Sequence, residues 1–271
     1  MSMMAGIVLA AMAASGPADG PAAVPQAAQP PAAERADLVT DRPDFTESSL
    51  VVGRGVWQLE TGAAYVGDAD GARAFAAPQA LLRLGLTDRF ELRLGASGFL
   101  VERSTLGADQ TVGGSDFEVG AKFTLLDEDR HGVALAIIPI VSLPVGSAAF
   151  SSGGVDPTVK VTLARELAGG FGLSGNVNVM SQSEDDGHVT RGAWSVSLGH
   201  ALFLGWGGYA EVYGFSSVVR GGQAAWTFNG GLTHGIGADR QFDVTLGRGL
   251  TAAADDWFVS AGFSLRGGWR R

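Results

Sequence analysis

Cysteine is absent from this chain of 271 residues, and lysine occurs only as Lys122 and Lys160. The lack of cysteine excludes a disulfide framework, thiolate catalysis, cysteine-based metal sites and a lipidated cysteine anchor. Charged residues make up only 17% of the chain and its net charge is -9, so no basic patch is available to neutralise the phosphates of a nucleic acid. Apolar runs as long as a transmembrane helix are also missing, which excludes a helical membrane protein.

The beginning of the chain differs in composition from the rest. An apolar run from Ala5 to Ala14 is followed by small residues, which predicts a signal-peptide-like segment over residues 1–16; a disordered alanine-rich tail is the alternative. Residues 17–37 are rich in proline and alanine and predict a flexible linker. Residues 38–55 are polar, and Pro43 blocks regular structure there, so we expect a separate plug-like segment on the periplasmic side.

From Val56 to about Trp269, apolar and polar residues alternate with a period of two. The segment Ala80–Leu100 predicts a β-hairpin with leucines on one face and charged residues on the other. Similar segments recur and predict about 12 antiparallel strands of roughly ten residues, the length that a tilted membrane strand needs. The expected fold is therefore all-β, an up-and-down transmembrane barrel over residues 56–269. A soluble sandwich would instead turn the leucines toward a core.

The placement of aromatic residues favours the membrane barrel. Among the apolar positions of each strand, the aromatic residues fall near the strand ends, whereas the middle positions are mostly Leu, Val and Ala. Membrane interfaces select such girdles. The expected girdle residues are Trp57, Tyr65, Phe90, Phe117, Phe171, Trp194, Trp206, Trp226, Phe242, Trp257 and Trp269. Connections also alternate between short turns and longer loops, so we expect both termini on the periplasmic side of a bacterial outer membrane.

Several segments carry a resemblance to a known family. They include TDRPDFTES at 40–48, WQLETG at 57–62, GLTDRFELRLG at 85–95, GSDFEVGAK at 114–122 and FDVTLGRGL at 242–250. With these segments the chain resembles the MetA-pathway phenol-degradation family of outer-membrane proteins. The resemblance implies an outer-membrane barrel with a channel or uptake role for aromatic or hydrophobic compounds. The partners expected for such a barrel are outer-membrane lipid and lipopolysaccharide, a small-molecule permeant and the barrel-assembly machinery.

The polar residues that alternate with the apolar ones along each strand predict a narrow, charged lumen. A three-residue turn that keeps the leucines on one face pairs Leu86 with Phe90, and this register places Arg83 opposite Arg93. Two facing guanidinium groups need anions near them. The expected constriction residues are Arg83, Glu91, Arg93, Glu60, Glu118, Lys122 and Lys160. They form either a closed salt-bridge network or a selectivity ring, and the pattern does not distinguish the two.

Charged residues just before the first strand predict a latch. Asp41, Arg42, Asp44 and Glu47 precede Val56, and we expect their carboxylates to meet Arg83 and Arg93 inside the barrel. A solvated tail leading into the first strand is the alternative. Removal of the latch is expected to raise the conductance of the channel.

Three functions are compatible with such a barrel. The first is a channel or transporter for small molecules, and the second is a structural or adhesion protein with a closed lumen. The third is a barrel hydrolase that uses Ser195 or Ser197, but no nucleophile motif surrounds either serine, so no enzymatic activity is expected. The histidines show no metal-ligand spacing, and we expect no metal or cofactor.

Overall fold

The computed structural model describes residues 38–68, 70–104, 110–184, 187–218 and 220–269. Both the expected signal-peptide-like segment and the expected linker lie outside the described residues. These described residues belong to one compact unit. Among the described residues, no helix has the length and apolar character needed to cross a membrane.

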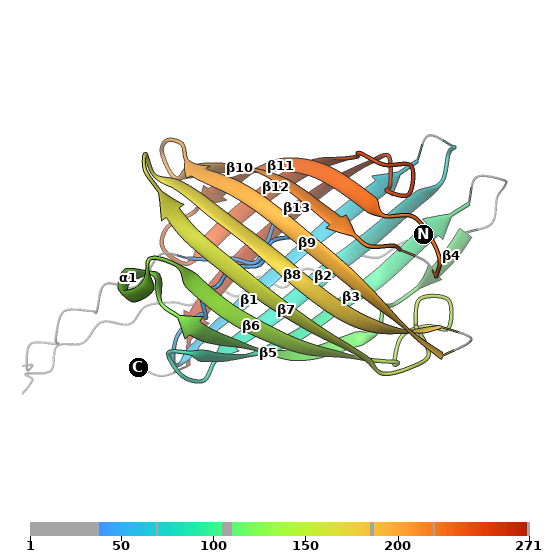
Figure 1. The fold of residues 1–271 in the computed structure, drawn as a ribbon, viewed down its shortest axis with the longest axis horizontal. Helices are drawn as coiled ribbons and strands as arrows, with labels where there is room; N and C mark the ends of the chain where they lie inside the picture. Colours follow the sequence, from blue (N-terminus) through green and yellow to red (C-terminus); the bar gives the residue numbers. More distant parts are fainter. Residues whose placement is uncertain (1–37, 69, 105–109, 185–186, 219, 270–271) are drawn as a thin grey trace, which may run out of the picture. The chain divides into compact units, whose positions relative to one another are not determined.

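Within the described parts of the chain, the alternating sequence folds into 13 strands and one helical turn (Figure 1). Their bounds are β1 Val56–Gly67, β2 Arg73–Gly85, β3 Phe90–Arg103, β4 Gln110–Gly113, β5 Phe117–Leu126, α1 Glu128–His131, β6 Ala134–Leu143, β7 Asp156–Leu167, β8 Phe171–Glu184, β9 Gly187–Ala201, β10 Trp206–Phe215, β11 Ala225–Gly235, β12 Arg240–Gly249 and β13 Trp257–Gly268.

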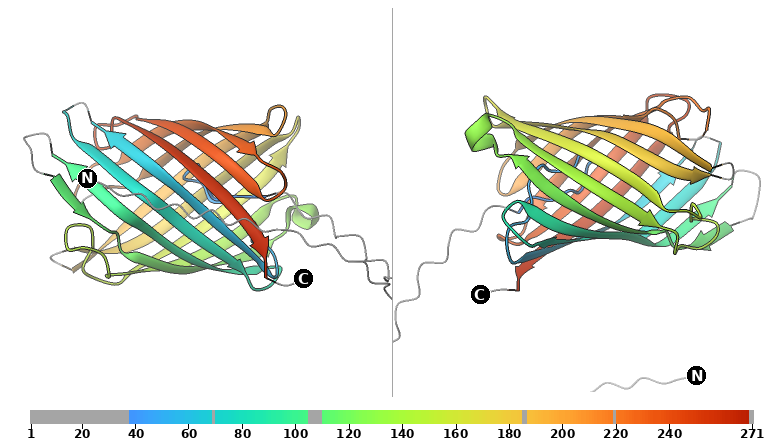
Figure 2. Two further views of the ribbon diagram at one scale, coloured as in Figure 1. Left: turned by 180° about the vertical axis from the view of Figure 1, so that it is seen from behind. Right: turned by 60° about the horizontal axis from the view of Figure 1, so that its bottom comes forward.

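The strands close into an antiparallel barrel of 12 strands, as predicted. Apart from β4 and β5, strands that are consecutive in sequence pair with each other, and β1 pairs with β13 to close the ring. The short strand β4 and the longer β5 both pair with β3, so together they fill one position of the barrel, interrupted at residues 114–116. Figure 2 shows the same tilted strands from two further sides.

The two rims of the barrel differ. One rim carries the turns at 86–89, 127–133, 168–170, 202–205 and 236–239, together with the start of β1 and the end of β13; we call it the short-turn rim. The opposite, long-loop rim carries the connections at 68–72, 144–155, 216–224 and 250–256. The connection between β8 and β9 is an exception to the longer loops expected on this side, because the two strands continue to pair as far as Glu184 and Gly187.

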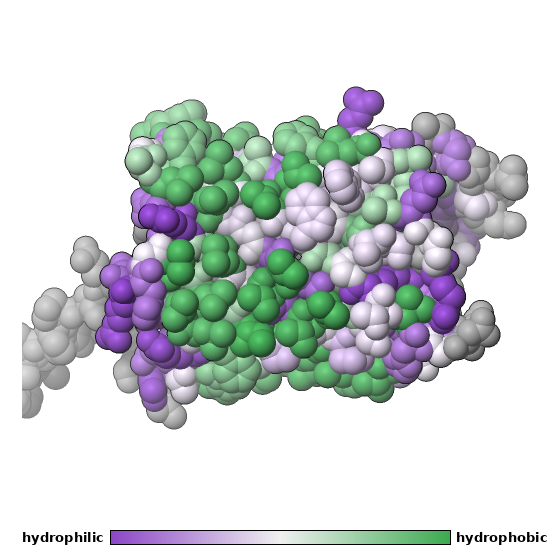
Figure 3. Space-filling model, in the orientation of Figure 1, coloured by the Kyte–Doolittle hydropathy of each residue, from purple (hydrophilic) through white to green (hydrophobic). Residues whose placement is uncertain are grey.

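Polarity is inverted relative to a soluble protein. Apolar side chains such as Val177 and Leu246 are 63% and 65% exposed on the outside, whereas Glu60, Glu91 and Asp243 on the inside are fully buried. In Figure 3 apolar residues cover much of the visible face and hydrophilic residues gather at its two ends. The expected girdle aromatics lie half-buried or exposed, in keeping with an outward position on the strands. Such an exterior suits lipid and such an interior suits water or polar side chains.

The β6 strand has an apolar inner face, although most of the lumen is polar. Its sequence is apolar at both inward and outward positions and contains Pro139, so alternation does not determine which side chains face inward. In the structure Ile138 and Ile140 are buried inside, whereas Pro139 lies exposed on the outer face. The lumen therefore carries one aliphatic stripe beside its charged groups.

Candidate functional site

Residues 38–55 run inside the barrel before β1 begins (Figure 2). Side chains from widely separated strands hold this 38–55 segment. For example, Gln241 on β12 donates a hydrogen bond to the Thr40 hydroxyl at 2.8 Å, and Thr162 on β7 donates one to the Glu47 carbonyl at 2.7 Å. The segment thus crosses the lumen rather than following one wall.

Two cavities lie on either side of the 38–55 segment. The larger, of about 780 Å³, lies toward the short-turn rim and is lined by residues that include Trp206 and Tyr209. The smaller, of about 480 Å³, lies toward the long-loop rim and includes Glu118. Arg42 and Glu47 line both cavities. The segment therefore forms the partition between them.

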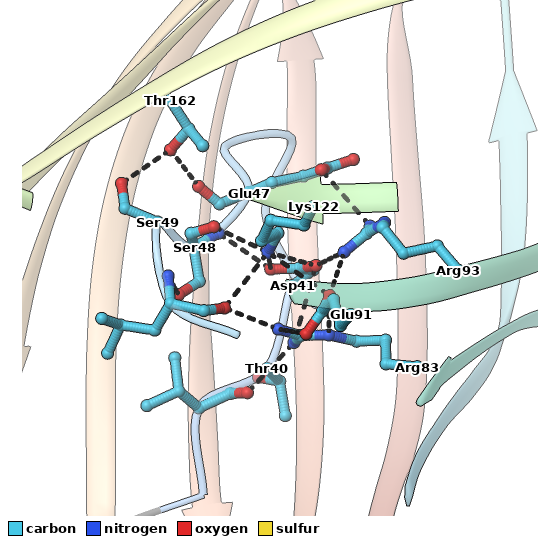
Figure 4. A network of polar contacts seen from close by, with 12 residues as sticks. Thr40, Asp41, Glu47, Ser48, Ser49, Arg83, Glu91, Arg93, Lys122 and Thr162 are labelled. Atoms are coloured by element: carbon cyan, nitrogen blue, oxygen red, sulfur yellow. Dashed lines mark hydrogen bonds and ion pairs between the residues drawn. The ribbon is translucent and has the colours of Figure 1, made fainter. Parts of the chain in front are cut away.

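The β2–β3 hairpin has the predicted register. Leu86 N–H donates to the Phe90 carbonyl at 3.0 Å, and Arg83 lies directly opposite Arg93. Between the two guanidinium groups lies Glu91, whose Oε1 accepts from Arg83 Nε at 2.8 Å and from Arg93 Nη1 at 3.0 Å (Figure 4). One wall carboxylate thus bridges both arginines.

Asp41 of the 38–55 segment completes this cluster (Figure 4). Its carboxylate accepts from Lys122 Nζ at 2.9 and 3.0 Å, forms an ion pair with Arg93, and lies 3.5 Å from Arg83 Nη1. Burial disfavours its charge, but the cations Arg83, Lys122 and Arg93 outweigh burial and hold the pKa of Asp41 well below its usual range. The Asp41 side chain therefore carries a negative charge at neutral pH.

Glu47 occupies a second position in the same network. Its carboxylate lies 2.6 Å from Lys160 Nζ and 3.3 Å from Arg93 Nη2. Burial again opposes the charge, yet Arg93 and Lys160 lower the pKa of Glu47. Asp41 and Glu47 together connect cations on four different strands, β2, β3, β5 and β7.

Three wall glutamates also bind the backbone of the segment. Glu60 accepts from the N–H groups of Asp41 and Arg42 at 2.9 Å each, and Glu91 accepts from Val52 N–H at 2.8 Å. Glu211 accepts from two further N–H groups, at 2.9 and 2.7 Å. Charged acceptors make the stronger class of hydrogen bond, so the path of the segment is held as firmly as its side chains.

Arg42 anchors the segment to β12 and β13, which follow β1 around the barrel wall. Its Nη2 donates to Asp243 at 3.1 Å and to the Ser260 hydroxyl at 3.0 Å. The guanidinium lies over Gly62 and Gly262, where any larger side chain would overlap it. The arginine expected in the latch thus reaches β12 and β13, and its Nη1 also donates to Gln79 on β2 at 3.5 Å.

Phe45 supplies an aromatic contact that the sequence interpretation missed. Its ring stacks on Tyr213 with a centroid distance of 4.6 Å and an interplanar angle of 11°, and it meets Phe215 edge-on at 5.4 Å. A phenylalanine inside a polar stretch was the signal that could have indicated an anchored segment. The alternation of polar and apolar residues along the strands does not indicate which side chain Phe45 contacts.

Asp44 differs from the other latch carboxylates. Burial and then the nearby carboxylate of Glu211 raise the pKa of Asp44 well above its usual range. Among the described residues, no arginine or lysine forms an ion pair with it. Asp44 therefore weakens the docking of the segment whenever it is ionised.

Glu118 is the expected constriction residue that the structure leaves apart. It lines the smaller cavity, is exposed there, and makes no ion pair with any described residue. The expectation that it neutralises the arginines is wrong, because it sits on β5 opposite Gly95 and beyond the level of Arg93. The other six expected residues lie in or beside the cluster.

Ser195, one of the two serines considered for hydrolysis, contacts the 38–55 segment, and its hydroxyl lies 2.7 Å from the Thr46 hydroxyl. A different serine, Ser183, lies 3.2 Å from a histidine, His188 Nε2, but its hydroxyl donates to Asp156 at 2.7 Å. In an activated serine the carboxylate orients the histidine instead. This geometry does not prepare a nucleophile.

Comparison with known proteins places this geometry in context. The sequence model of the family described as "Putative MetA-pathway of phenol degradation" matches residues 40–267. The structure is similar to an outer membrane channel from Pseudomonas putida F1, with 14% identity, a TM-score of 0.60, and coverage of 83% of this chain and 99% of that chain. It is also similar to the NanC porin, with 10% identity, a TM-score of 0.54, and coverage of 76% and 98%. No curated protein matches the sequence.

Proposed function

Because the chain belongs to the MetA-pathway phenol-degradation family, we propose that it is an outer-membrane channel for small molecules. Its fold is shared with a protein described as an outer membrane channel and with a porin. A polar lumen inside an apolar barrel surface supports this role, because an aqueous path across a membrane needs both. The outer surface would contact membrane lipid and lipopolysaccharide.

In this proposal the 38–55 segment is a plug. The observation that carries it is the partition of the lumen, in which Arg42 and Glu47 belong to the walls of both cavities. Small molecules would pass when the segment leaves its place, since its side chains occupy the level of the charged cluster. Phe45 and its aromatic neighbours would leave a surface that suits aromatic permeants.

The proposed orientation places both termini in the periplasm. The short-turn rim carries the start of β1 and the end of β13, and short turns face the periplasm in bacterial barrels. Because the chain has no cysteine, single cysteines can be introduced at Ser151 on the long-loop rim and at Asp88 on the short-turn rim. A membrane-impermeant maleimide should label only Ser151→Cys in intact cells; labelling of Asp88→Cys alone would reverse the orientation.

The plug can be tested in planar bilayers. Deletion of residues 40–48 removes Asp41, Arg42, Asp44 and Glu47 together and should raise single-channel conductance well above that of the wild type. Replacement of the same residues by an equally long Gly/Ser stretch is the matched control for chain length, and it should behave like the deletion. A heat-dependent mobility shift on gels verifies that each barrel is folded. Unchanged conductance in both variants would contradict the plug.

A closed-lumen structural or adhesion protein is the second candidate. The observation that favours it is the charge pairing across the partition, in which three wall glutamates and four wall cations bind one segment. Such a protein would be silent in the bilayer both before and after the deletion. Discrete current steps after the deletion would exclude this candidate.

A further inference from the structure

The lumen wall around the constriction has more positive than negative charge. Four wall cations face this level, and we call them the cation cluster: Arg83, Arg93, Lys122 and Lys160. Within the described residues, the wall carboxylates that pair with them are Glu60 and Glu91. The remaining counter-charges come from Asp41 and Glu47 of the 38–55 segment. The four cations of the cluster are therefore matched by four paired carboxylates only while the segment is docked.

Three cationic side chains surround the Asp41 carboxylate and form a carboxylate-binding position, which we call the socket. An ammonium group contacts both oxygens of the carboxylate, and the guanidinium groups of Arg93 and Arg83 approach one of them. Those three cationic side chains are at most 4% exposed. Ammonium and guanidinium groups held in place by packing recognise a carboxylate with little loss of side-chain entropy. In the docked structure the three groups thus already converge on one carboxylate position.

Departure of the segment would leave two positive charges without partners. Buried charges that lose their partners are strongly unfavourable. Water entering the lumen offsets part of this, and an anion offsets more because it restores the lost ion pairs. A docked segment and a bound anion therefore compete for the same groups.

We propose that the cation cluster is a binding site for small carboxylate anions, which replace Asp41 and Glu47 when the 38–55 segment undocks. This inference rests on the proposed channel function. Anions that bind only the undocked state shift the equilibrium toward it, in proportion to their affinity. The channel would then be opened by its permeant and be selective for anions.

The retained wall glutamates limit the charge of the ligand. Glu60 and Glu91 stay beside the socket, with Glu91 only 2.8 Å from Arg83 Nε and 3.0 Å from Arg93 Nη1. They would repel a compact, multiply charged phosphate more than two separated carboxylates. One dicarboxylate, or two monocarboxylates, matches the charge that Asp41 and Glu47 supply.

The test uses the channel that lacks residues 40–48. A potassium chloride gradient across the bilayer should give a reversal potential of the sign expected for chloride selectivity, and potassium malonate should block the chloride current in a concentration-dependent way. The double variant Arg93→Gln, Lys122→Gln should lose both properties. Arg191→Gln is the matched control, because Arg191 is a buried β9 arginine paired with Glu184 outside the cluster. It should retain both properties.

The outcomes separate this inference from the channel proposal. Absence of any conductance would overturn the channel and the site together. Conductance with cation selectivity, or with equal block by inorganic phosphate and malonate, would overturn the carboxylate site alone. A second measurement does not need current. In the full chain carrying Asp41→Ala and Glu47→Ala, malonate should raise the thermal unfolding midpoint more than potassium chloride of equal ionic strength, and an equal rise would contradict the proposal.

Discussion

Gly62 on β1 and Gly262 on β13 lie directly opposite each other, and the guanidinium of Arg42 rests over both. A Cβ atom on Gly62 would lie 2.5 Å from Arg42 Cζ, and one on Gly262 would lie 2.3 Å from Arg42 Nε. Glycine at a strand interior often marks such a close approach. Two residues about 200 positions apart in sequence therefore make room for one side chain of the segment.

Gly262→Ala should loosen the 38–55 segment. The overlapping atoms belong to the flexible Arg42 side chain, so the barrel should fold, while the hydrogen bonds from Arg42 to Asp243 and Ser260 are lost. Bonds to charged groups contribute about 1.5–3 kcal/mol each, so the undocked population should rise at least about tenfold. Maleimide labelling of Ser49→Cys measures it, because Ser49 is 1% exposed when docked.

Gly172→Ala is the control for this substitution. Gly172 is on β8 and lines the larger cavity, and a Cβ atom there would meet no atom within 4 Å. Its labelling rate should equal that of the parent Ser49→Cys protein. Equal acceleration by both alanines would show that the Arg42 contact does not hold the segment.

Glu211→Gln should weaken docking from the β10 side. The carboxylate accepts from Phe45 N–H, Thr46 N–H and the Thr46 hydroxyl, and an amide replaces one of its oxygens by a donor that faces these donors. We expect a loss of about 1.5–3 kcal/mol in docking free energy, read as faster labelling of Ser49→Cys. Glu118→Gln should leave the rate unchanged, since Glu118 contacts no ion-pair partner among the described residues. Faster labelling in Glu118→Gln than in Glu211→Gln would contradict the role of Glu211 in holding the segment.

Phe45→Ala should release the aromatic anchor. Stacking on Tyr213 and the edge contact with Phe215 add about 0.5–1.5 kcal/mol per pair to the burial of the ring. Phe45→Leu keeps an apolar side chain but no ring, so its effect should be intermediate. Open probability in the bilayer should be highest for Phe45→Ala, intermediate for Phe45→Leu and lowest for the wild type. Identical values for Leu and wild type would assign the effect to burial alone.

Opening should increase as the pH rises above about 4. Docking raises the pKa of Asp44 above its usual value, so the docked state binds more protons; this contribution is complete below the usual value and is lost as the pH rises through the raised pKa. Asp41 acts oppositely, because its pKa is lowered and its contribution is lost only as the pH falls below about 4. Open probability measured from pH 4.5 to 8 should rise, and Asp44→Asn should flatten the rise. A steeper rise of open probability with pH in Asp44→Asn would contradict the assignment of this pH dependence to Asp44.

The barrel could be predicted because alternation is a local property. The period of two assigns each side chain to a face, so Glu60, Glu91 and Arg93 were expected inside, and the short turn after Leu86 set the pairing of Arg83 with Arg93. Alternation failed where it was weak or interrupted. The inner face of β6 and the extended β8–β9 hairpin were not recognised for that reason.

The level of each inward residue along the barrel could not be predicted in this way. Strand tilt and stagger decide which residues from different strands share a level, and these depend on closure of the whole sheet. Glu118 therefore lies beyond the cluster, although it has the same parity as Lys122. The path of an irregular segment is likewise set by its tertiary contacts, as the reach of Arg42 to Asp243 shows.

The sequence by itself determined the strands, their inner and outer faces and the charges that enter the lumen, because these follow from periodicity and composition. Only the tertiary structure decided that Asp41 meets Lys122 and that Phe45 meets Tyr213, because each pair joins an irregular segment to a distant strand. The same contacts show that the 38–55 segment supplies the counter-charges of the cation cluster. This relation depends on distances across the closed barrel, which no local pattern contains.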